Sequence, residues 1–292
     1  MRLQSHHLEL LSPARDAAIA REAILHGADA VYIGGPGFGA RHNASNSLSD
    51  IAELVPFAHR FGAKVFVTLN TILHDDELEP AQRLITDLYQ AGVDALIVQD
   101  MGVLELDIPP IELHASTQCD IRTVEKAKFL SDVGFSQIVL ARELNLNQIR
   151  DIHQATDATI EFFIHGALCW CVSGRCYWSS YMGGKSGLRG RCVQPCRRVY
   201  KQRNHSGRFF SCLDLSLDVL AKTITDIPHL SCWKIEGRKK GPHYVYHVVT
   251  AYKMLRDNPD DPQARKDAEK ILEMALGRPS TRARFLPQRT SE

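Results

Sequence analysis

Residues 16–33 read DAAIAREAILHGADAVYI, and this stretch shows the unit that decides the fold. Its first part has the apolar spacing of an amphipathic helix and ends in glycine, as helices often do. A short apolar run follows at once, as expected for a strand that is covered on both faces. Eight such runs occur along the chain, at residues 8–11, 30–33, 64–69, 95–98, 112–115, 137–140, 159–164 and 232–235.

The spacing of these runs indicates the class of fold. Most follow one another at roughly 20–30 residues, with helical patterns between them, as in the βα repeats of a parallel sheet. Eight repeats favour a closed (β/α)8 TIM-like barrel over an open doubly wound sheet. We therefore predict an α/β protein whose barrel occupies residues 1–256, followed by a polar helix and a basic tail at 257–292.

One segment, residues 169–208, interrupts this rhythm after the seventh predicted strand. It holds five of the eight cysteines of the chain, nine lysines or arginines, and no aspartate or glutamate. Barrel enzymes carry their active sites at the C-terminal ends of the strands. We expect this cysteine-rich, basic insertion to lie there.

The cysteine spacing predicts a metal site. Four thiols form the pattern Cys169-x6-Cys176-x15-Cys192-x3-Cys196. Thiolates at such intervals can converge on a [4Fe–4S] cluster or on zinc, and the long first gap, unlike a zinc knuckle, favours the cluster. Cys171, Cys212 and Cys232 are alternative ligands, whereas Cys119 is expected to be a buried apolar residue.

Polar side chains at the ends of the predicted strands supply a second set of candidates. For proton transfer at the barrel mouth we expect His114, His165 and Glu236. For binding an acidic small molecule we expect Arg41, Asn70 and Arg142. Each of these residues, taken alone, has a simpler use in satisfying a loop backbone or pairing with a neighbour.

The glycine-rich segment GGPGFGA at residues 34–40 resembles a phosphate-binding loop but matches neither common nucleotide-binding motif. No Lys-Ser/Thr pair follows it, as a P-loop requires, and it lacks the GxGxxG pattern of dinucleotide-binding folds. A tight strand-to-helix loop that lets a ligand approach the backbone is the safer interpretation.

The basic insertion also contains aromatic residues, which favours a nucleic-acid partner. Arginine and lysine bind phosphates, and exposed rings stack on unpaired bases. The rings are Trp170, Tyr177, Trp178, Tyr181 and Tyr200. A solvated cationic face, or a charged surround that tunes a cluster, would explain the same charges.

The N-terminal segment MRLQSHHLELL lacks the apolar core of a signal peptide, and no apolar run is long enough to span a bilayer. We therefore expect a cytoplasmic protein without membrane association. In that compartment, clustered cysteines are more often metal ligands or catalytic thiols than disulfides.

Several segments of the chain resemble the peptidase U32 family. The most specific are EFFIHGALC at residues 161–169, followed by SGRC at 173–176, and KIEGR at 234–238. Upstream, residues 10–47 and ELHASTQCD at 112–120 are similar to the branch of that family that hydroxylates a cytidine of 23S rRNA. The resemblance covers most of the chain.

This resemblance implies a function that the spacing alone does not. Despite the family label, its members include oxygen-independent hydroxylases of rRNA cytidine, tRNA wobble uridine and ubiquinone precursors. The resemblance implies a [4Fe–4S] cluster on Cys169, Cys176, Cys192 and Cys196, an RNA substrate, a 5-hydroxypyrimidine product and a dependence on prephenate. The rRNA branch also has a long C-terminal extension, so a protein partner that supplies further RNA-binding surface is a second expectation.

Other functions stay open at this point. A U32-type peptidase has little support, because the sequence contains neither HExxH nor GxSxG. A hydroxylase of a ubiquinone precursor would need an apolar pocket and no affinity for RNA. A non-catalytic iron–sulfur or RNA-binding module would leave the barrel mouth without a role.

Overall fold

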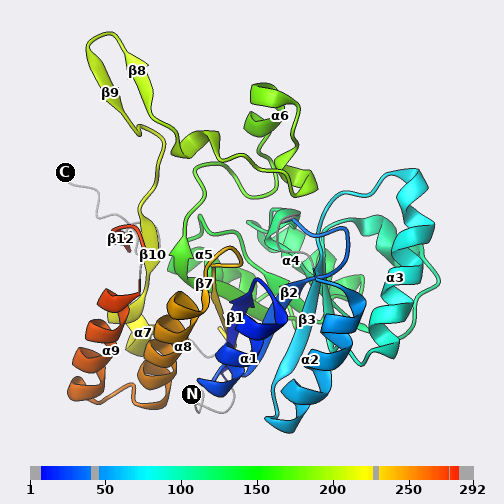
Figure 1. Ribbon diagram of the computed structural model, residues 1–292, viewed down its shortest axis with the longest axis horizontal. Coiled ribbons are helices and arrows are strands. Elements are labelled where there is room, and N and C mark those ends of the chain that lie inside the picture. Colours follow the sequence, from blue (N-terminus) through cyan, green and yellow to red (C-terminus); the bar gives the residue numbers. More distant parts are fainter. Residues whose placement is uncertain (1–7, 41–45, 226–229, 276, 283–292) are drawn as a thin grey trace.

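The computed structural model describes residues 8–40, 46–225, 230–275 and 277–282, which form a closed α/β barrel (Figure 1). Neighbouring barrel strands pair in parallel. The eighth barrel strand pairs with both the seventh and the first, which closes the ring. The eight barrel strands are β1 (Glu9–Ala14), β2 (Ala30–Gly34), β3 (Lys64–Leu69), β4 (Ala95–Val98), β5 (Glu112–Ala115), β6 (Gln137–Val139), β7 (Thr159–Ala167) and β11 (Cys232–Ile235). All eight coincide with the predicted strands, so the predicted fold class is confirmed.

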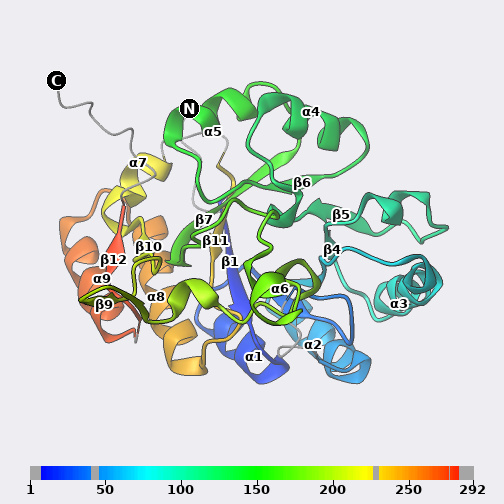
Figure 2. The same ribbon diagram turned by 90° about the horizontal axis from the view of Figure 1, so that it is seen from above.

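Helices surround this barrel on the outside, and the cysteine-rich insertion crosses above it (Figure 2). The outer helices are α1 (Ala17–Leu25), α2 (Leu48–Arg60), α3 (Leu78–Gln90), α4 (Val124–Asp132), α5 (Leu146–His153) and α8 (Pro242–Asp257). A further helix, α9 (Pro262–Met274), packs against α8. Between β4 and β5 the chain forms only a short 3-10 helix, Met101–Glu105. None of the helices in the described ranges is both long and apolar enough to cross a membrane.

Several of the helices begin where the sequence supplies a capping side chain. Asp16 accepts a hydrogen bond from the backbone N–H of Ile19, and Ser47 and Asp50 form a reciprocal capping box at the start of α2. Beyond the end of α1, Gly27 has a φ of +103° and turns the chain toward β2. These local signals set the alternation of helix and strand.

The barrel interior is partly polar. Its apolar part is a small cluster that includes Tyr32, Phe66 and Ile97. Beside it, Glu161 and Lys234 form a buried ion pair, and the amide nitrogen of Gln137 donates to Glu161 Oε2 at 2.5 Å. Charged groups inside a protein need such partners, because losing water is costly for them.

The insertion follows β7, as predicted, and rises from the C-terminal end of the barrel (Figure 1). It contains the short helix α6 (Trp178–Gly183) and a projecting hairpin of β8 (Tyr200–Gln202) and β9 (His205–Gly207). The chain returns as β10 (Asp214–Ser216), which pairs antiparallel with β7, and continues through α7 (Ala221–Thr225). A terminal strand, β12 (Ser280–Thr281), pairs with β10.

Candidate metal centre and barrel mouth

Five cysteines of the insertion line one cavity at the C-terminal end of the barrel. The cavity has a volume of about 120 Å³, and its thiols belong to Cys169, Cys171, Cys176, Cys192 and Cys196. All five are free thiols. The insertion thus brings the four predicted ligands and one alternative to the same place.

The three remaining cysteines do not line this cavity. Cys232 is fully buried at the start of β11, and its thiol donates to Glu9 Oε1 at 3.2 Å. Cys119 is buried as predicted, with its sulfur 3.7 Å from the carbonyl oxygen of Val98. Cys212 is half-buried against the apolar core. Of the alternative ligands, only Cys171 therefore lies near the predicted four.

The cavity thiols influence one another electrostatically. Burial, with smaller contributions from a hydrogen bond with Cys176 and from the neighbouring thiols, raises the pKa of Cys171 to about 12. Burial also raises the pKa of Cys196, and the nearby thiols of Cys169, Cys192 and Cys176 add to this increase. Across the described ranges, no three Cys, His, Asp or Glu side chains already surround one point as ligands of a single ion. The thiols line a shared space rather than a closed single-ion site.

Specific contacts hold the cysteine-bearing turns against the barrel. The hydroxyl and backbone N–H of Ser173 both donate to Glu143 at 3.0 Å. Gly174 has a φ of +72°, and a Cβ there would lie 2.0 Å from the carbonyl oxygen of Gln118. Arg197 donates to the carbonyl oxygens of Leu168 and Cys212 at 2.5 Å each. These contacts fix both ends of the insertion.

A second, smaller cavity lies at the barrel mouth and adjoins the first. Gln118, Arg142 and Glu236 line both cavities. The mouth is otherwise lined by polar side chains from the strand ends, namely Tyr32, Thr68, Asn70, Ser116, Thr117, Lys234 and Arg238, together with a few apolar groups. The cysteine cavity therefore adjoins a polar, mainly cationic mouth.

Arg142 is a fixed cation between the two cavities. Its Nη2 atom is 3.0 Å from Glu236 Oε2, and its guanidinium carbon is 4.2 Å from the ring centre of Phe163. Burial lowers the pKa of Arg142, but the charges of Glu236 and Cys169 raise it, and its pKa lies above the usual value. Its Nε atom is buried and has no hydrogen-bond partner within the described structure.

Asn70 also lies at the mouth, where its side-chain amide links two neighbouring segments. Its Oδ1 atom accepts from the backbone N–H of Ala40 at 2.9 Å, and its Nδ2 atom donates to Ser116 Oγ at 3.1 Å. Asn70 therefore positions the end of the glycine-rich loop. Arg41, the remaining predicted ligand-binding residue, falls outside the described residues.

Two predicted proton-transfer residues do not lie where we expected them. His114 is buried inside the barrel below the mouth, packed edge-on against Phe66 and 3.6 Å from Glu112. His165 faces away from the mouth, with its Nδ1 atom 3.2 Å from Ser216 Oγ and 3.3 Å from the hydroxyl of Tyr252. Of the three, only Glu236 lines the mouth.

The partly buried position of His165 predicts a pH-dependent stability. Burial lowers its pKa to about 4, against the opposing charges of Asp218 and Asp214, whereas an unfolded histidine has a pKa of about 6.5. Between these values the unfolded chain binds the proton more readily, so stability falls as the pH falls from about 6.5 toward 4. Urea unfolding should show that the wild type loses about 1–3 kcal/mol more than His165→Gln over this range. Parallel losses in the two proteins would show that His165 is not the titrating group.

The mouth residues that sequence analysis did not single out include Lys234 and Tyr32. Lys234 lies within a short apolar strand, and its buried ammonium group is 4.2 Å from the ring centre of Tyr32. The sequence did contain a signal for Lys234, since a lysine inside an apolar run indicates a buried lysine with a charged partner. A lysine is almost never fully buried unless it is paired. Tyr32 gave no signal, since tyrosine is common in strands.

The fold and the site define a (β/α)8-barrel protein with a candidate metal centre over the C-terminal ends of its strands. The chain belongs to peptidase family U32, whose model matches residues 15–292. The solved structure of the U32 peptidase Mk0906 has the same fold, with a TM-score of 0.54 at 11% identity, over 81% of this chain and 94% of that one.

Curated relatives carry different names within this family. The 23S rRNA 5-hydroxycytidine C2501 synthase of Escherichia coli K12 is 71% identical over 264 residues, which are 88% of this chain and 40% of that protein. The tRNA hydroxylation protein P1 of Bacillus subtilis is 36% identical, over 85% of this chain and 63% of that protein. A collagenase of Porphyromonas gingivalis is 31% identical, over 84% and 64%. The chain therefore spans only 40–64% of the length of these relatives.

Proposed function

We propose that this chain is the barrel portion of an RNA base hydroxylase that forms a 5-hydroxypyrimidine, with 5-hydroxycytidine in 23S rRNA favoured over 5-hydroxyuridine in tRNA. The observation that carries the proposal is the cavity of five thiols that adjoins the barrel mouth, with Arg142 and Glu236 lining both. The 71% identity to the E. coli rRNA enzyme supports the choice of product.

The donor set fits an iron–sulfur cluster better than a single zinc ion. Around one zinc, four thiolates lie about 2.3 Å from the metal and crowd one point. Cluster ligands bind different iron atoms and therefore lie farther apart, which agrees with thiols spread around a shared cavity. We assign Cys169, Cys176, Cys192 and Cys196 as ligands of a [4Fe–4S] cluster. When bound, such a cluster supplies electron transfer at the mouth.

The mouth suits a small carboxylate cofactor of the prephenate class. Arg142, Lys234 and Arg238 bring three cationic side chains to this cavity, whereas Glu236 is the acidic group lining it. The buried, unpartnered Nε atom of Arg142 offers a donor to a carboxylate. Glu236 is the group at the mouth that can accept a proton, and its ion pair with Arg142 holds it in place.

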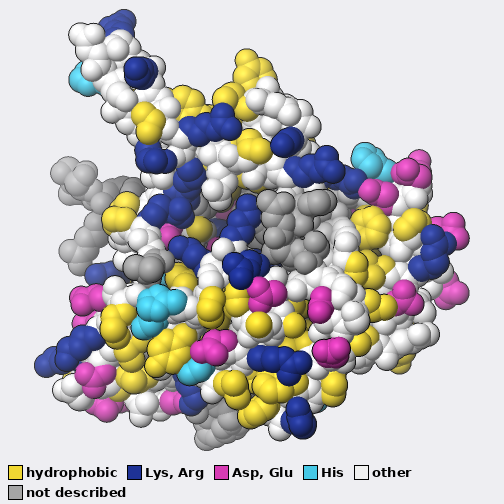
Figure 3. All heavy atoms as spheres, in the orientation of Figure 1, with side chains coloured by type: hydrophobic (Ala, Val, Ile, Leu, Met, Phe, Trp, Pro, Cys, Tyr) yellow, Lys and Arg dark blue, Asp and Glu magenta, His cyan; other side chains and the backbone are white. Residues whose placement is uncertain are grey.

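The insertion offers a surface for single-stranded RNA. Lysine and arginine side chains gather over it and along the hairpin (Figure 3). Tyr177 and Tyr181 are 67% and 89% exposed, which leaves their rings available for stacking on bases. The other predicted stacking rings, Trp170, Trp178 and Tyr200, pack with Phe210 in one aromatic cluster. That cluster supports the insertion instead.

The geometry does not favour the two competing enzymatic functions. A cysteine peptidase needs a histidine beside its nucleophile, and no histidine lines the cysteine cavity within the described residues. A hydroxylase of an apolar quinone precursor would not need cationic groups at the mouth. The surface charge of the insertion adds to the case for RNA.

The function is tested by nucleoside mass spectrometry of rRNA and tRNA from a strain that lacks the gene. We expect 5-hydroxycytidine in 23S rRNA to disappear and to return when the wild-type gene is supplied. A Tyr181→Ala gene should restore the modification less well, because loss of one stacked base costs about 1–3 kcal/mol of binding. An exposed Tyr89→Ala variant on α3 is the matched control. Unchanged levels of both 5-hydroxypyrimidines in the deletion strain would reject the proposal.

A further inference from the structure

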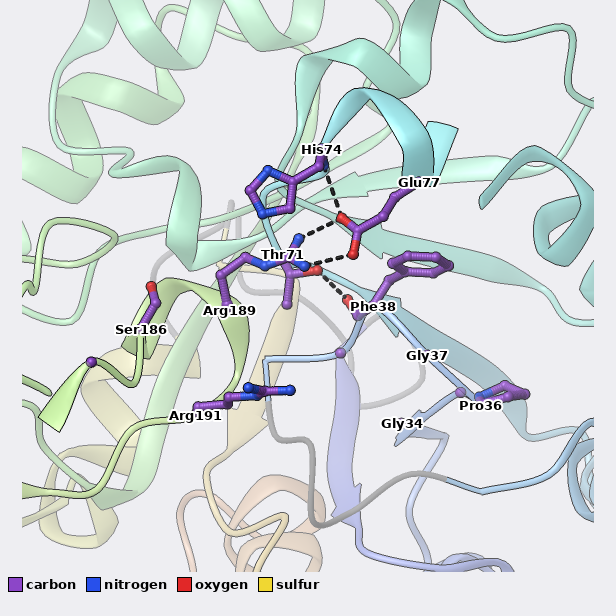
Figure 4. Close-up of a pocket in the computed structure, with 13 residues that line it drawn as sticks. Gly34, Pro36, Gly37, Phe38, Thr71, His74, Glu77, Ser186, Arg189 and Arg191 are labelled. Atoms are coloured by element: carbon purple, nitrogen blue, oxygen red, sulfur yellow. Dashed lines mark hydrogen bonds and ion pairs between the residues drawn. The ribbon is translucent and has the colours of Figure 1, made fainter. Parts of the chain in front are cut away.

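A third cavity lies beside the mouth and shares no lining residue with the other two. Its volume is about 470 Å³, and it lies between the glycine-rich loop at 34–39, the segment after β3, and insertion residues 184–191 (Figure 4). None of the residues assigned above to the cluster, the cofactor or base stacking lines it. The cavity therefore needs an explanation of its own.

The charged side chains that line this cavity carry a net positive charge. Its acidic residue, Glu77, accepts two hydrogen bonds of 2.6 Å from Arg189, so its charge is neutralised. Arg191 extends along the cavity wall (Figure 4). Its side chain makes no hydrogen bond or ion pair with any residue that the structure describes, although it lies beside a polar cavity. A guanidinium group in that position is available to an anion.

The glycine-rich loop leaves room for a ligand at Gly37. Its φ lies outside the left-handed region, and a Cβ built there would meet no atom within 4 Å. Neither backbone strain nor packing in the described structure therefore requires glycine at this position. Gly37 itself lines the cavity that Arg191 also lines.

One thin segment separates this cavity from the cysteine cavity. Gly187, Leu188 and Cys192 line the cysteine side, whereas Arg189 and Arg191 line the other. A strand of nucleic acid that enters one cavity therefore passes directly beside the other. Neighbouring nucleotides of the same strand are the natural occupants of two such cavities.

We propose that this third cavity binds the backbone phosphate of a nucleotide adjoining the one that is modified. Arg191 would pair with the phosphate oxygens, and the bare backbone at Gly37 would let the sugar–phosphate approach closely. This inference rests on the proposed function, since it assumes an RNA substrate. It goes beyond that function by assigning a separate phosphate subsite to residues outside the cluster and the mouth.

Equilibrium binding of a labelled single-stranded RNA that contains the target cytidine tests the proposal. We expect Arg191→Gln to weaken binding about 5–20-fold and to lower the slope of log K against log salt by about 1, as loss of one phosphate contact does. Gly37→Val should weaken binding without changing that slope, because it fills space and leaves the charge unaltered. Arg150→Gln removes an exposed cation from the last turn of α5 and should leave both quantities unchanged.

Each other outcome has a definite meaning. Wild-type affinity and salt slope in Arg191→Gln would overturn the proposal, as would a wild-type protein that binds no RNA. Cytidine monophosphate that binds the wild type through Arg191, while RNA binding ignores Arg191, would assign the cavity to a free phosphate ester and also overturn it. Arg191-dependent RNA binding without any hydroxylation would retain this inference and reject the proposed function.

Discussion

Replacing Cys192 with serine is expected to remove the bound iron and to abolish hydroxylation. Cys192 lines the cavity shared by the other insertion thiols, and the hydroxyl of Ser179 donates to its sulfur at 3.7 Å. A serine hydroxyl stays protonated where a cysteine can supply a thiolate ligand. Even changes outside the ligands of a metal site cost roughly 10–100-fold in affinity or activity, so a larger loss is expected here. Iron and sulfide content of anaerobically purified protein measures the first effect, and 5-hydroxycytidine formation measures the second.

Two matched variants make this test specific. Cys212→Ser changes a half-buried cysteine that does not line the cavity, so its iron content should equal that of the wild type. Cys171→Ser changes a cavity cysteine outside the predicted set of four and should also retain iron. If Cys171→Ser loses iron while Cys169→Ser keeps it, Cys171 replaces Cys169 as a ligand. If Cys192→Ser keeps its full iron content, the assigned ligand set is wrong.

The fold was predictable because its signals are local. A run such as Ala95–Val98 is apolar throughout, since helices cover one side of the strand and the barrel interior the other. Glycines such as Gly27 mark the helix ends before the next strand begins. Eight repeats of this pattern leave few topologies to consider. The cysteine spacing likewise predicted that distant thiols line one cavity.

The two histidines were misplaced for different reasons, because alternation does not give the depth of a side chain in the barrel and it fails at a bulge. Ser116 lines the mouth, and side chains two residues apart share a face, so His114 lies one layer deeper, about 7 Å along the strand. His165 would face the interior if alternation from Phe163 continued. The register between β7 and β11 shifts at this point, and a bulge of this kind re-aims the side chain toward α8.

Long-range pairs were also beyond the reach of sequence patterns. The pair between Arg142 and Glu236 joins residues that are 94 positions apart, and the one between Arg189 and Glu77 spans 112 positions. Their partners are chosen by the closure of the barrel and by the path of the insertion over it. A short-range sequence pattern predicts neither the closure of the barrel nor the path of the insertion.

Replacing Lys234 with methionine is expected to destabilise the barrel by about 3–5 kcal/mol, because removal of one partner leaves a buried charge without compensation. The side chain of Lys234 is 5% exposed and that of its partner Glu161 is 0% exposed. Gln137 alone would then remain to satisfy the Glu161 carboxylate. Methionine has nearly the length of the lysine stem, so the cavity contribution to this loss should be small. Urea unfolding at pH 7 measures it.

The double variant Lys234→Met/Glu161→Gln separates lost charge compensation from poor packing. With both charges gone, the amide groups at positions 137 and 161 can hydrogen-bond to each other, and no uncompensated charge stays in the interior. We therefore expect the double variant to be more stable than Lys234→Met alone, with an interaction free energy of about 1–3 kcal/mol between the two sites. Strictly additive losses would mean that the ion pair is not what holds these two strands in the barrel interior. If the ion pair does hold them, Lys234 has two roles. Its charge faces the proposed cofactor and also compensates the buried carboxylate of Glu161.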